Sequence, residues 1–161
     1  LFDAPLERIG VLIHPQSVVH SMVEFVDGSV LAQMGVTDMY FPIQNALLHP
    51  ERIENRRASL DLASLGALTF QEVPAGRYPC LDLCFEAARA GGAAPAVLNA
   101  ANEVAVEAFL ERRIRFGRIA GIIGETLSRH DNAPADSLEA IEAADGWARS
   151  ATRELAKKVE G

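Results

Sequence analysis

The spacing of apolar residues changes near residue 75, and this change most constrains what the chain can fold into. After Arg77, apolar residues recur three and four positions apart, which is the spacing of one face of a helix. Before it, short apolar runs end at Gly, Pro or Asp-Gly, which is typical of strands and turns. We therefore expect an α+β protein, in which a partial mixed or antiparallel sheet with a hairpin precedes a C-terminal four-helix bundle.

The first third of the chain predicts strands. Residues 9–13 form a continuous apolar run, which favours a strand covered on both faces. Two further apolar segments, residues 22–26 and 29–34, flank Asp27-Gly28. That order predicts a hairpin with a type I′ turn, since both central positions of such a turn need a positive φ.

A short helix and a connector follow the hairpin. Asp38 is a candidate cap for a helix over residues 39–48, and Pro50 ends that helix. Residues 51–65, with Asn55 among them, contain few periodic apolar positions and predict a surface connector. Residues 68–73 predict a short extended piece.

Four helices are expected in the remainder of the chain. They cover residues 78–90, a segment that begins at Pro95, residues 116–129 and residues 138–159. Asp136 or Ser137 is expected to cap the last one. The apolar positions predicted to face inward are Leu81, Cys84, Phe85 and Ala88, then Val97, Leu98, Ala101, Val104, Ala105, Ala108 and Phe109, and finally Leu138, Ile141, Ala148, Leu155 and Val159. In the third helix, Gly117, Gly121 and Gly124 predict a ridge without side chains that a neighbouring helix could approach closely.

Composition narrows the function classes. The 161 residues carry a net charge of -7, which gives no long-range attraction to nucleic acid or to an anionic membrane. No apolar run approaches the roughly 20 residues that span a bilayer, so we expect a cytoplasmic protein. The two cysteines, Cys80 and Cys84, lack the spacing of a redox or zinc site and predict free thiols packed in the core. The chain opens without an initiator methionine, which suggests a fragment or a processed product.

Two histidines precede the hairpin. As a metal pair, His14 and His20 form a weak candidate, because no Cys or third His lies nearby. Ser17 near His20 could form a nucleophile and its base, but this pattern is common by chance. For His14 a hydrogen bond to local backbone is favoured. For His20, in a loop before the hairpin, contact with a ligand and a structural role both remain open.

Further polar residues have structural alternatives. Asp38 and Met39 could be functional, or could serve as a helix cap and a core methionine. Asn99 and Asn102-Glu103 lie away from the apolar face of their helix, so surface or inter-element hydrogen bonds are favoured over catalysis. The sequence contains no glycine-rich phosphate loop, no GxGxxG and no carboxylate cluster with metal spacing.

Several segments in order resemble the 1-deoxy-D-xylulose-5-phosphate reductoisomerase family, over essentially the whole chain. They are residues 14–21 (HPQSVVHS), the hairpin of residues 22–35 with DGSVLAQ at 27–33, Asp38-Met39, residues 68–70 (LTF), residues 77–81 (RYPCL) and residues 98–103 (LNAANE). The resemblance implies an enzyme that rearranges and reduces 1-deoxy-D-xylulose 5-phosphate, a phosphosugar, to 2-C-methyl-D-erythritol 4-phosphate in the non-mevalonate isoprenoid pathway. It also implies NADPH, Mn²⁺ or Mg²⁺, and a homodimer.

In that family, residues 1–50 would be the C-terminal part of the central catalytic and dimerisation domain, 51–75 a connector, and 76–161 the helical bundle. The nucleotide site, the metal carboxylates and the phosphate-binding group would precede Leu1, so neither cofactor is expected to bind this chain alone. We therefore expect the isolated chain to be inactive. The alternative is a noncatalytic structural and dimerisation module.

Two residues match the family's functional positions. His20 resembles the histidine that lines the active site, which implies a catalytic or substrate-orienting role. Met39 resembles the apolar residue that closes over substrate, which implies substrate binding. Thr37 stands where some members have Pro, and His14 is assigned a structural role.

Overall fold

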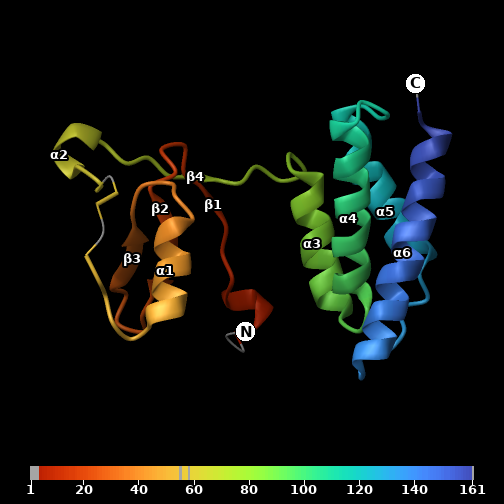
Figure 1. Ribbon diagram of the computed structural model, residues 1–161, viewed down its shortest axis with the longest axis horizontal. Coiled ribbons are helices and arrows are strands. Elements are labelled where there is room, and N and C mark those ends of the chain that lie inside the picture. Colours follow the sequence, from red (N-terminus) through yellow and green to blue (C-terminus); the bar gives the residue numbers. More distant parts are fainter. Residues whose placement is uncertain (1–3, 55, 58, 161) are drawn as a thin grey trace. The chain divides into compact units, whose positions relative to one another are not determined.

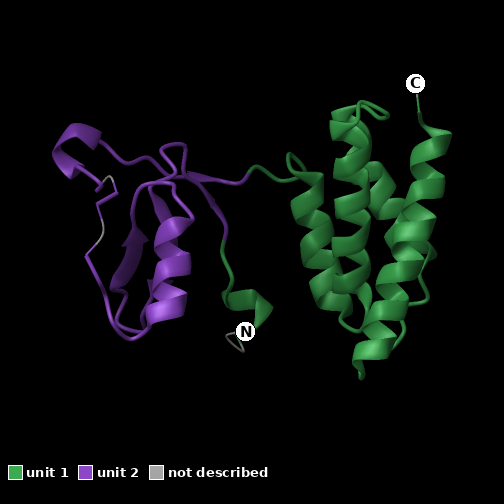
Figure 2. Ribbon diagram, in the orientation of Figure 1, with its two compact units in different colours: residues 1–10, 74–161 green, residues 11–73 purple. Residues whose placement is uncertain are grey.

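The structure is a computed structural model that describes residues 4–54, 56–57 and 59–160. It divides into two compact units, each described by itself (Figure 2). The strand unit comprises residues 11–73, and the helical unit comprises residues 1–10 and 74–161. Two small antiparallel sheets and six α-helices occur within the described residues, so the α+β class is confirmed.

The strand unit contains two pairs of antiparallel strands (Figure 1). β1 (Leu12–Ile13) pairs with β4 (Gln71–Glu72), which lies in the predicted extended piece. β2 (Val19–Glu24) pairs with β3 (Val30–Met34), and the register shifts between Val19 and Ser21. The predicted hairpin is therefore confirmed, with an irregularity near its start.

The prediction for residues 9–13 is wrong. Only Leu12–Ile13 form a strand, a 3-10 helix (Leu6–Arg8) precedes it, and Ile9, Val11 and Leu12 are exposed. A continuous apolar run signals a buried strand mainly in parallel sheets, whose faces are covered by helices. β1 is a two-residue antiparallel strand, and such strands can leave a face open to water.

The predicted type I′ turn is also wrong. The N–H of Gly28 donates to the carbonyl of Phe25 (2.9 Å), and the N–H of Phe25 donates to the carbonyl of Ser29 (2.9 Å). Gly28 alone takes a positive φ (82°), while Asp27 does not. The Asp27 carboxylate accepts bonds from the N–H and hydroxyl of Ser29, 2.9 and 2.6 Å away. This local bonding favours a three-residue loop that ends in a left-handed glycine.

Asp38 bonds to the start of the next helix, although Met39 rather than Asp38 occupies the N-cap position. Its carboxylate accepts a hydrogen bond from the N–H of Tyr40 (2.9 Å), at the start of α1 (Tyr40–Leu48). The predicted connector contains one short helix, α2 (Leu62–Leu65), capped by Asp61. Asn55 in that connector lies outside the described residues.

The helical unit consists of α3 (Pro79–Ala90), α4 (Ala94–Leu110), a 3-10 turn (Phe116–Arg118), α5 (Ile119–Arg129) and α6 (Leu138–Lys158). α4 packs against the other three helices, and α5 packs against α3 and α6 (Figure 1). The α4 face is as predicted, because Val97, Ala101, Val104, Ala105 and Ala108 are all buried. Alanines dominate this core, which allows helix axes to approach closely.

The inward face of α3 is not the predicted one. Cys84 is exposed, as is Cys80, so neither thiol packs in the core. Ala87 is buried instead, and Leu83 packs partly buried against the core. A Cβ added at Gly124 of α5 would lie 3.6 Å from Leu83, which is an ordinary van der Waals contact. A short helix rich in small apolar residues has two overlapping apolar faces. Packing against the neighbouring helices decides which of the two is buried.

The glycine ridge predicted for residues 117–124 is not used for a close helix approach. An added Cβ at Gly117 or Gly121 would meet nothing within 4 Å. The buried face consists of Ile119, Ile122, Ile123 and Thr126. Burial of branched aliphatic side chains outweighs close backbone approach, so the isoleucines set the orientation of the helix.

α6 is capped by Ser137, whose hydroxyl accepts from the N–H of Ala140 (3.1 Å). Ala148 and Leu155 are buried as predicted, but Leu138 and Ile141 are exposed. The buried stripe begins only at Ala144, so the first turn of the helix extends past its neighbours.

A pair of buried threonines joins α5 to α6. The Thr126 hydroxyl donates to the carbonyl of Ile122 (2.9 Å), and the Thr152 hydroxyl donates to that of Ala148 (2.6 Å). The two hydroxyl oxygens lie 3.1 Å apart. Each hydroxyl has one hydrogen, so the two oxygens bond to each other only when one hydroxyl turns away from its carbonyl to donate to the other. Both buried oxygens therefore have a hydrogen-bond partner in an otherwise apolar core.

The corner between α3 and α4 depends on Gly92. Its φ is +53°, and an added Cβ would come within 2.9 Å of Ala133 and Asn132. The Asn132 side chain accepts from the N–H of Ala94 (3.0 Å) and donates to the carbonyl of Ala90 (3.2 Å). The Gly91-Gly92 corner is thus a site of close approach by the segment after α5.

Candidate functional site

The loops around Ser17 and Thr37 in the strand unit meet at one backbone carbonyl. The carbonyl oxygen of Ser17 lies 3.1 Å from Nε2 of His20 and accepts a hydrogen bond from the Thr37 hydroxyl (3.0 Å). Gly35 also donates its N–H to the carbonyl of Val18 (2.9 Å). These bonds hold the two loops together, and the second loop leads directly into Met39.

His20 occupies a β-bulge rather than the predicted loop. It lies in β2, between Val19, which pairs with Met34, and Ser21, which pairs with Gln33. His20 is the extra residue between these pairs, so its side chain is released from the regular alternation of the strand. Bulges re-aim side chains and are over-represented next to active sites.

The contact with Ser17 fixes which nitrogen of His20 carries a proton. A carbonyl oxygen only accepts hydrogen bonds, so Nε2 must be the donor. In the neutral imidazole, Nδ1 is then left with a lone pair. The same contact shows that His20 meets the Ser17 carbonyl rather than its hydroxyl, so the suggested nucleophile and base pair is not formed.

Asp38 lies between a helix start and a cation. Its carboxylate contacts the guanidinium of Arg57 at 2.8 Å, and that guanidinium stacks 4.5 Å from the ring centre of Tyr40. The hydrogen bond from the N–H of Tyr40, followed by the bond and charge of Arg57, lowers the pKa of Asp38 below its ordinary value of 3.8. Asp38 is therefore held as a carboxylate beside Met39.

Met39 is not a core residue. Its side chain is 69% exposed, so the alternative that it packs in the core is wrong. An exposed methionine is a flexible apolar surface that can adapt to a bound molecule. Its position follows directly from the loop that Thr37 anchors.

His14 is held by a segment distant in sequence, not by local backbone as expected. Its Nδ1 lies 2.9 Å from the carbonyl of Thr69, and its ring stacks on Phe70 with centres 4.6 Å apart. Gln16 bonds to the Thr69 hydroxyl (2.9 Å) and N–H (3.2 Å). Nε2 of His14 is buried with no hydrogen-bond partner among the described residues.

The polar residues of α4 form links between helices. Glu103 accepts from Asn99 (3.0 Å) and from Arg149 of α6 (2.7 Å), and Arg149 also contacts Asp145 at 2.6 Å. The bonds to Arg149 and Asn99 lower the pKa of Glu103, while those to Asp145 and Glu103 raise the pKa of Arg149. This arrangement is the inter-element bonding that was favoured over catalysis.

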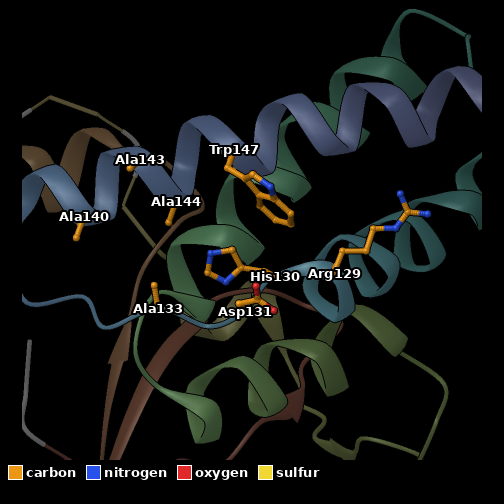
Figure 3. A pocket seen from close by; sticks show the side chains of 8 residues that line it. All are labelled: Arg129, His130, Asp131, Ala133, Ala140, Ala143, Ala144 and Trp147. Atoms are coloured by element: carbon orange, nitrogen blue, oxygen red, sulfur yellow. The ribbon is translucent and has the colours of Figure 1, made fainter.

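A shallow hollow of about 390 Å³ lies in the helical unit. Figure 3 shows Trp147 of α6 beside His130, with ring centres 4.9 Å apart, and three alanines along the same helix. Nδ1 of His130 is buried and has no hydrogen-bond partner within the described chain. A smaller hollow of about 90 Å³ lies beside α1 in the strand unit.

Neither Thr37 nor Arg57 was predicted as a site residue, and Thr37 was noted only for standing where some family members have Pro. Because Thr37 directly precedes Asp38-Met39, its position in the sequence could have indicated that it belongs to the candidate site. Arg57 belongs to a connector without periodicity, and nothing in the order of residues pairs it with Asp38 across 19 positions.

The described residues do not fit a metal site. They contain no group of three or more His, Cys, Asp or Glu side chains that could hold an ion. His14 and His20 each place a ring nitrogen against a backbone carbonyl, from Thr69 and from Ser17. In the same part of the chain, no helix combines the length and apolarity needed to cross a membrane.

Comparison with known proteins gives consistent matches. The DXP reductoisomerase C-terminal domain matches residues 34–151. The 1-deoxy-D-xylulose 5-phosphate reductoisomerase of Ralstonia nicotianae is 61% identical over 149 residues, covering 92% of this chain and 38% of that protein. The Pseudomonas putida (strain W619) protein of the same name is 56% identical, and the match covers 98% of this chain and 40% of that protein.

Solved structures agree with the sequence relatives. The reductoisomerase of Zymomonas mobilis in complex with NADPH is 46% identical with a TM-score of 0.88, covering 97% of this chain and 41% of that one. A reductoisomerase in complex with NADPH, fosmidomycin and magnesium is 42% identical with a TM-score of 0.78, with 91% and 38% covered. The chain thus spans about two fifths of the length of its relatives. It belongs to the DXP reductoisomerase family, through that family's C-terminal domain.

Proposed function

We propose that this chain forms the C-terminal part of an enzyme that converts 1-deoxy-D-xylulose 5-phosphate to 2-C-methyl-D-erythritol 4-phosphate. The enzyme would use NADPH and Mg²⁺ or Mn²⁺. Identity of 61% to a protein of that name supports the assignment. NADPH and magnesium are present in solved relatives, and we propose that both bind to parts of the enzyme other than these 161 residues.

The observation that carries the proposal is the bulge at His20. It presents an imidazole whose Nε2 is committed to the Ser17 carbonyl and whose Nδ1 is available. We propose that Nδ1 of the neutral ring accepts a hydrogen bond from a substrate hydroxyl, and so orients the substrate for rearrangement. Met39, anchored through Thr37, would cover the apolar side of the substrate and exclude water.

Kinetics of His20 variants in the full-length enzyme test this role. His20→Ala should lower kcat/KM by more than about tenfold, because a substrate hydroxyl left without its acceptor inside the site costs ~1–3 kcal/mol. The thermal unfolding temperature should change little, because His20 is exposed. His49→Ala removes an exposed imidazole just after α1, and serves as the matched control with unchanged kinetics.

Two conservative variants separate the ring nitrogens. The amide of Asn reaches the position of Nδ1, whereas the amide of Gln reaches that of Nε2. His20→Asn should therefore retain more activity than His20→Gln, although only Gln keeps a donor for the Ser17 carbonyl. If all His20 variants had the same kinetics as the parent enzyme, His20 would have only a structural role.

The second candidate function is a noncatalytic structural and dimerisation module. We propose that the isolated chain neither turns over substrate nor binds NADPH tightly, since its sequence has no glycine-rich nucleotide loop. Calorimetry with NADPH, together with an assay that follows NADPH absorbance, measures both properties. Turnover by the isolated chain near that of a full enzyme would contradict the proposal.

We further propose the division into residues 1–50, 51–75 and 76–161 for the enzyme, with α3 to α6 as a four-helix bundle that braces the catalytic domain. Packing of α4 against the other three helices supports the bundle. A cytoplasmic location stays a prediction from the sequence.

We propose a homodimer formed through the β2–β3 hairpin. Its apolar residues Met22, Val23, Phe25 and Val30 are exposed, and a two-stranded sheet has open edges that can pair with another chain. Light scattering of Met22→Lys and Val30→Asp variants should report monomers. Leu138→Asp, on the exposed start of α6, should stay dimeric, and the opposite pattern would place the interface on the helices.

A further inference from the structure

Cys80 and Cys84 lie on adjacent turns of α3, and both are exposed. Residues four apart on a helix are neighbours on its surface, with Cβ atoms about 5–6 Å apart. They are the two cysteines of the sequence, so neither has another thiol with which to pair within the chain. Since neither packs in the core, hydrophobic burial does not account for the pair.

The charge state of one thiol affects the other. Partial burial of the sulfur, followed by the charge of Cys84, raises the pKa of Cys80 above its ordinary value of 9.0. The helical spacing of the two residues is in keeping with this second effect. The same effect disfavours two thiolates side by side, and a bound cationic centre would remove that repulsion.

Helix geometry separates the possible reactions of this pair. A disulfide needs Cβ atoms about 3.5–4.5 Å apart, which is shorter than the helical spacing, so oxidation would require α3 to distort. A bridging atom with two bonds of about 2.3 Å to sulfur tolerates a wider separation. A soft centre between the sulfurs is therefore compatible with an intact helix, whereas a direct sulfur–sulfur bond is not.

We propose that Cys80 and Cys84 form a two-sulfur binding site on the surface of α3 for a soft, thiophilic centre that takes two thiolate ligands. Thiolates select such soft centres over hard cations. With a trivalent arylarsenic oxide, two As–S bonds form and the As=O bond breaks. The two thiol protons leave with that oxygen as one water, and no atom changes oxidation state.

Titration of the 161-residue chain with phenylarsine oxide tests the site. One arsenic should remove two free thiols, as counted by a thiol reagent, while circular dichroism reports unchanged helix content. The single variants Cys80→Ser and Cys84→Ser should bind at least about a hundredfold more weakly, because joining two ligands on one scaffold typically gains 10²–10⁴.

A matched control keeps two cysteines but moves one to another face. In the double variant Asp82→Cys with Cys84→Ser, the thiols are two positions apart, and i, i+2 positions do not face each other on a helix. This variant should bind as weakly as the single variants. In a concentrated urea solution, which unfolds the helix, it should bind as well as the unaltered chain.

Three results would overturn the proposal. The first is equal affinity of the native and relocated pairs in the folded chain. The second is an adduct that consumes only one thiol for each arsenic. The third is loss of helix content in step with binding, which would show that the folded spacing excludes the bridge.

Discussion

The two units hold their structures by different means. In the helical unit, apolar side chains from four helices, many of them alanines, form a core in which residues such as Val97, Ala105 and Ala148 are fully buried. In the strand unit, Val18 is the only buried residue among those described, and several large apolar side chains of the hairpin are exposed. Hydrogen bonds that meet at Ser17 and Thr69 tie its loops together instead. The candidate site is therefore positioned by polar contacts, whereas the helical unit is held by packing.

The largest expected difference between the units comes from removing aliphatic side chains. Ile123→Ala, in the core of the helical unit, should lower the free energy of unfolding by about 2–5 kcal/mol through lost burial and a cavity. Val26→Ala, at a position 110% exposed in the hairpin turn, should change it by less than about 0.5 kcal/mol. Urea unfolding followed by circular dichroism measures both. Similar losses would mean that the hairpin is packed more firmly than its exposure indicates.

A larger side chain at the contact between α4 and α6 tests how closely these two helices pack. Ala148→Leu adds three carbons at a position with no exposure, and should cost about 1–3 kcal/mol by overpacking. Ala143→Leu on the exposed side of the same helix is the matched control, with an expected change within about 0.5 kcal/mol. Thermal unfolding by calorimetry compares them. Tolerance of Ala148→Leu would show spare space between the helices.

Removing a buried hydroxyl should have a smaller effect. Thr152→Val keeps the side-chain shape but deletes the bonds to Ala148 and Thr126, which should cost about 1 kcal/mol. Thr126→Val should cost a similar amount. In a double-mutant cycle the two losses should not add, because the residues share one contact. Additive losses would indicate that the hydroxyls act independently.

The smallest effect concerns the polar contacts of the strand unit. The folded pKa of Asp38 is lowered, so its carboxylate stabilises the fold above its ordinary pKa, and this contribution is lost as the pH falls through the lowered value. Asp38→Asn should therefore be slightly less stable than the parent near neutral pH and equal to it near pH 2. Carboxyl chemical shifts followed by NMR give the pKa directly. A pKa at or above the ordinary value would rule out the contact with Arg57 in solution.

Sequence periodicity predicted the helical unit better than the strand unit. The α4 face was correct because a long helix with seven regularly spaced apolar residues has one consistent burial stripe. The α3 face was shifted, and the start of α6 was wrong, because short stripes of alanine and leucine are compatible with more than one orientation. Packing against neighbouring helices determines the orientation of each helix. The apolar period of a single segment does not encode that orientation.

Parts of the candidate site were visible in the sequence, and others were not. His20 and Met39 were found by resemblance to a family, while Asp38 was found as a candidate cap. The bulge that re-aims His20 depends on the register of two strands, which apolar spacing does not specify. The bonds from His14 and Gln16 to Thr69 join positions more than 50 residues apart, and local sequence carries no signal for them.

Trp147, the single tryptophan of the sequence, packs against His130 within the helical unit. Its near-ultraviolet emission therefore reports on that unit, and the chain contains an intrinsic optical probe of the hollow beside α6. Unfolding of the helical unit can be followed by this signal without any label.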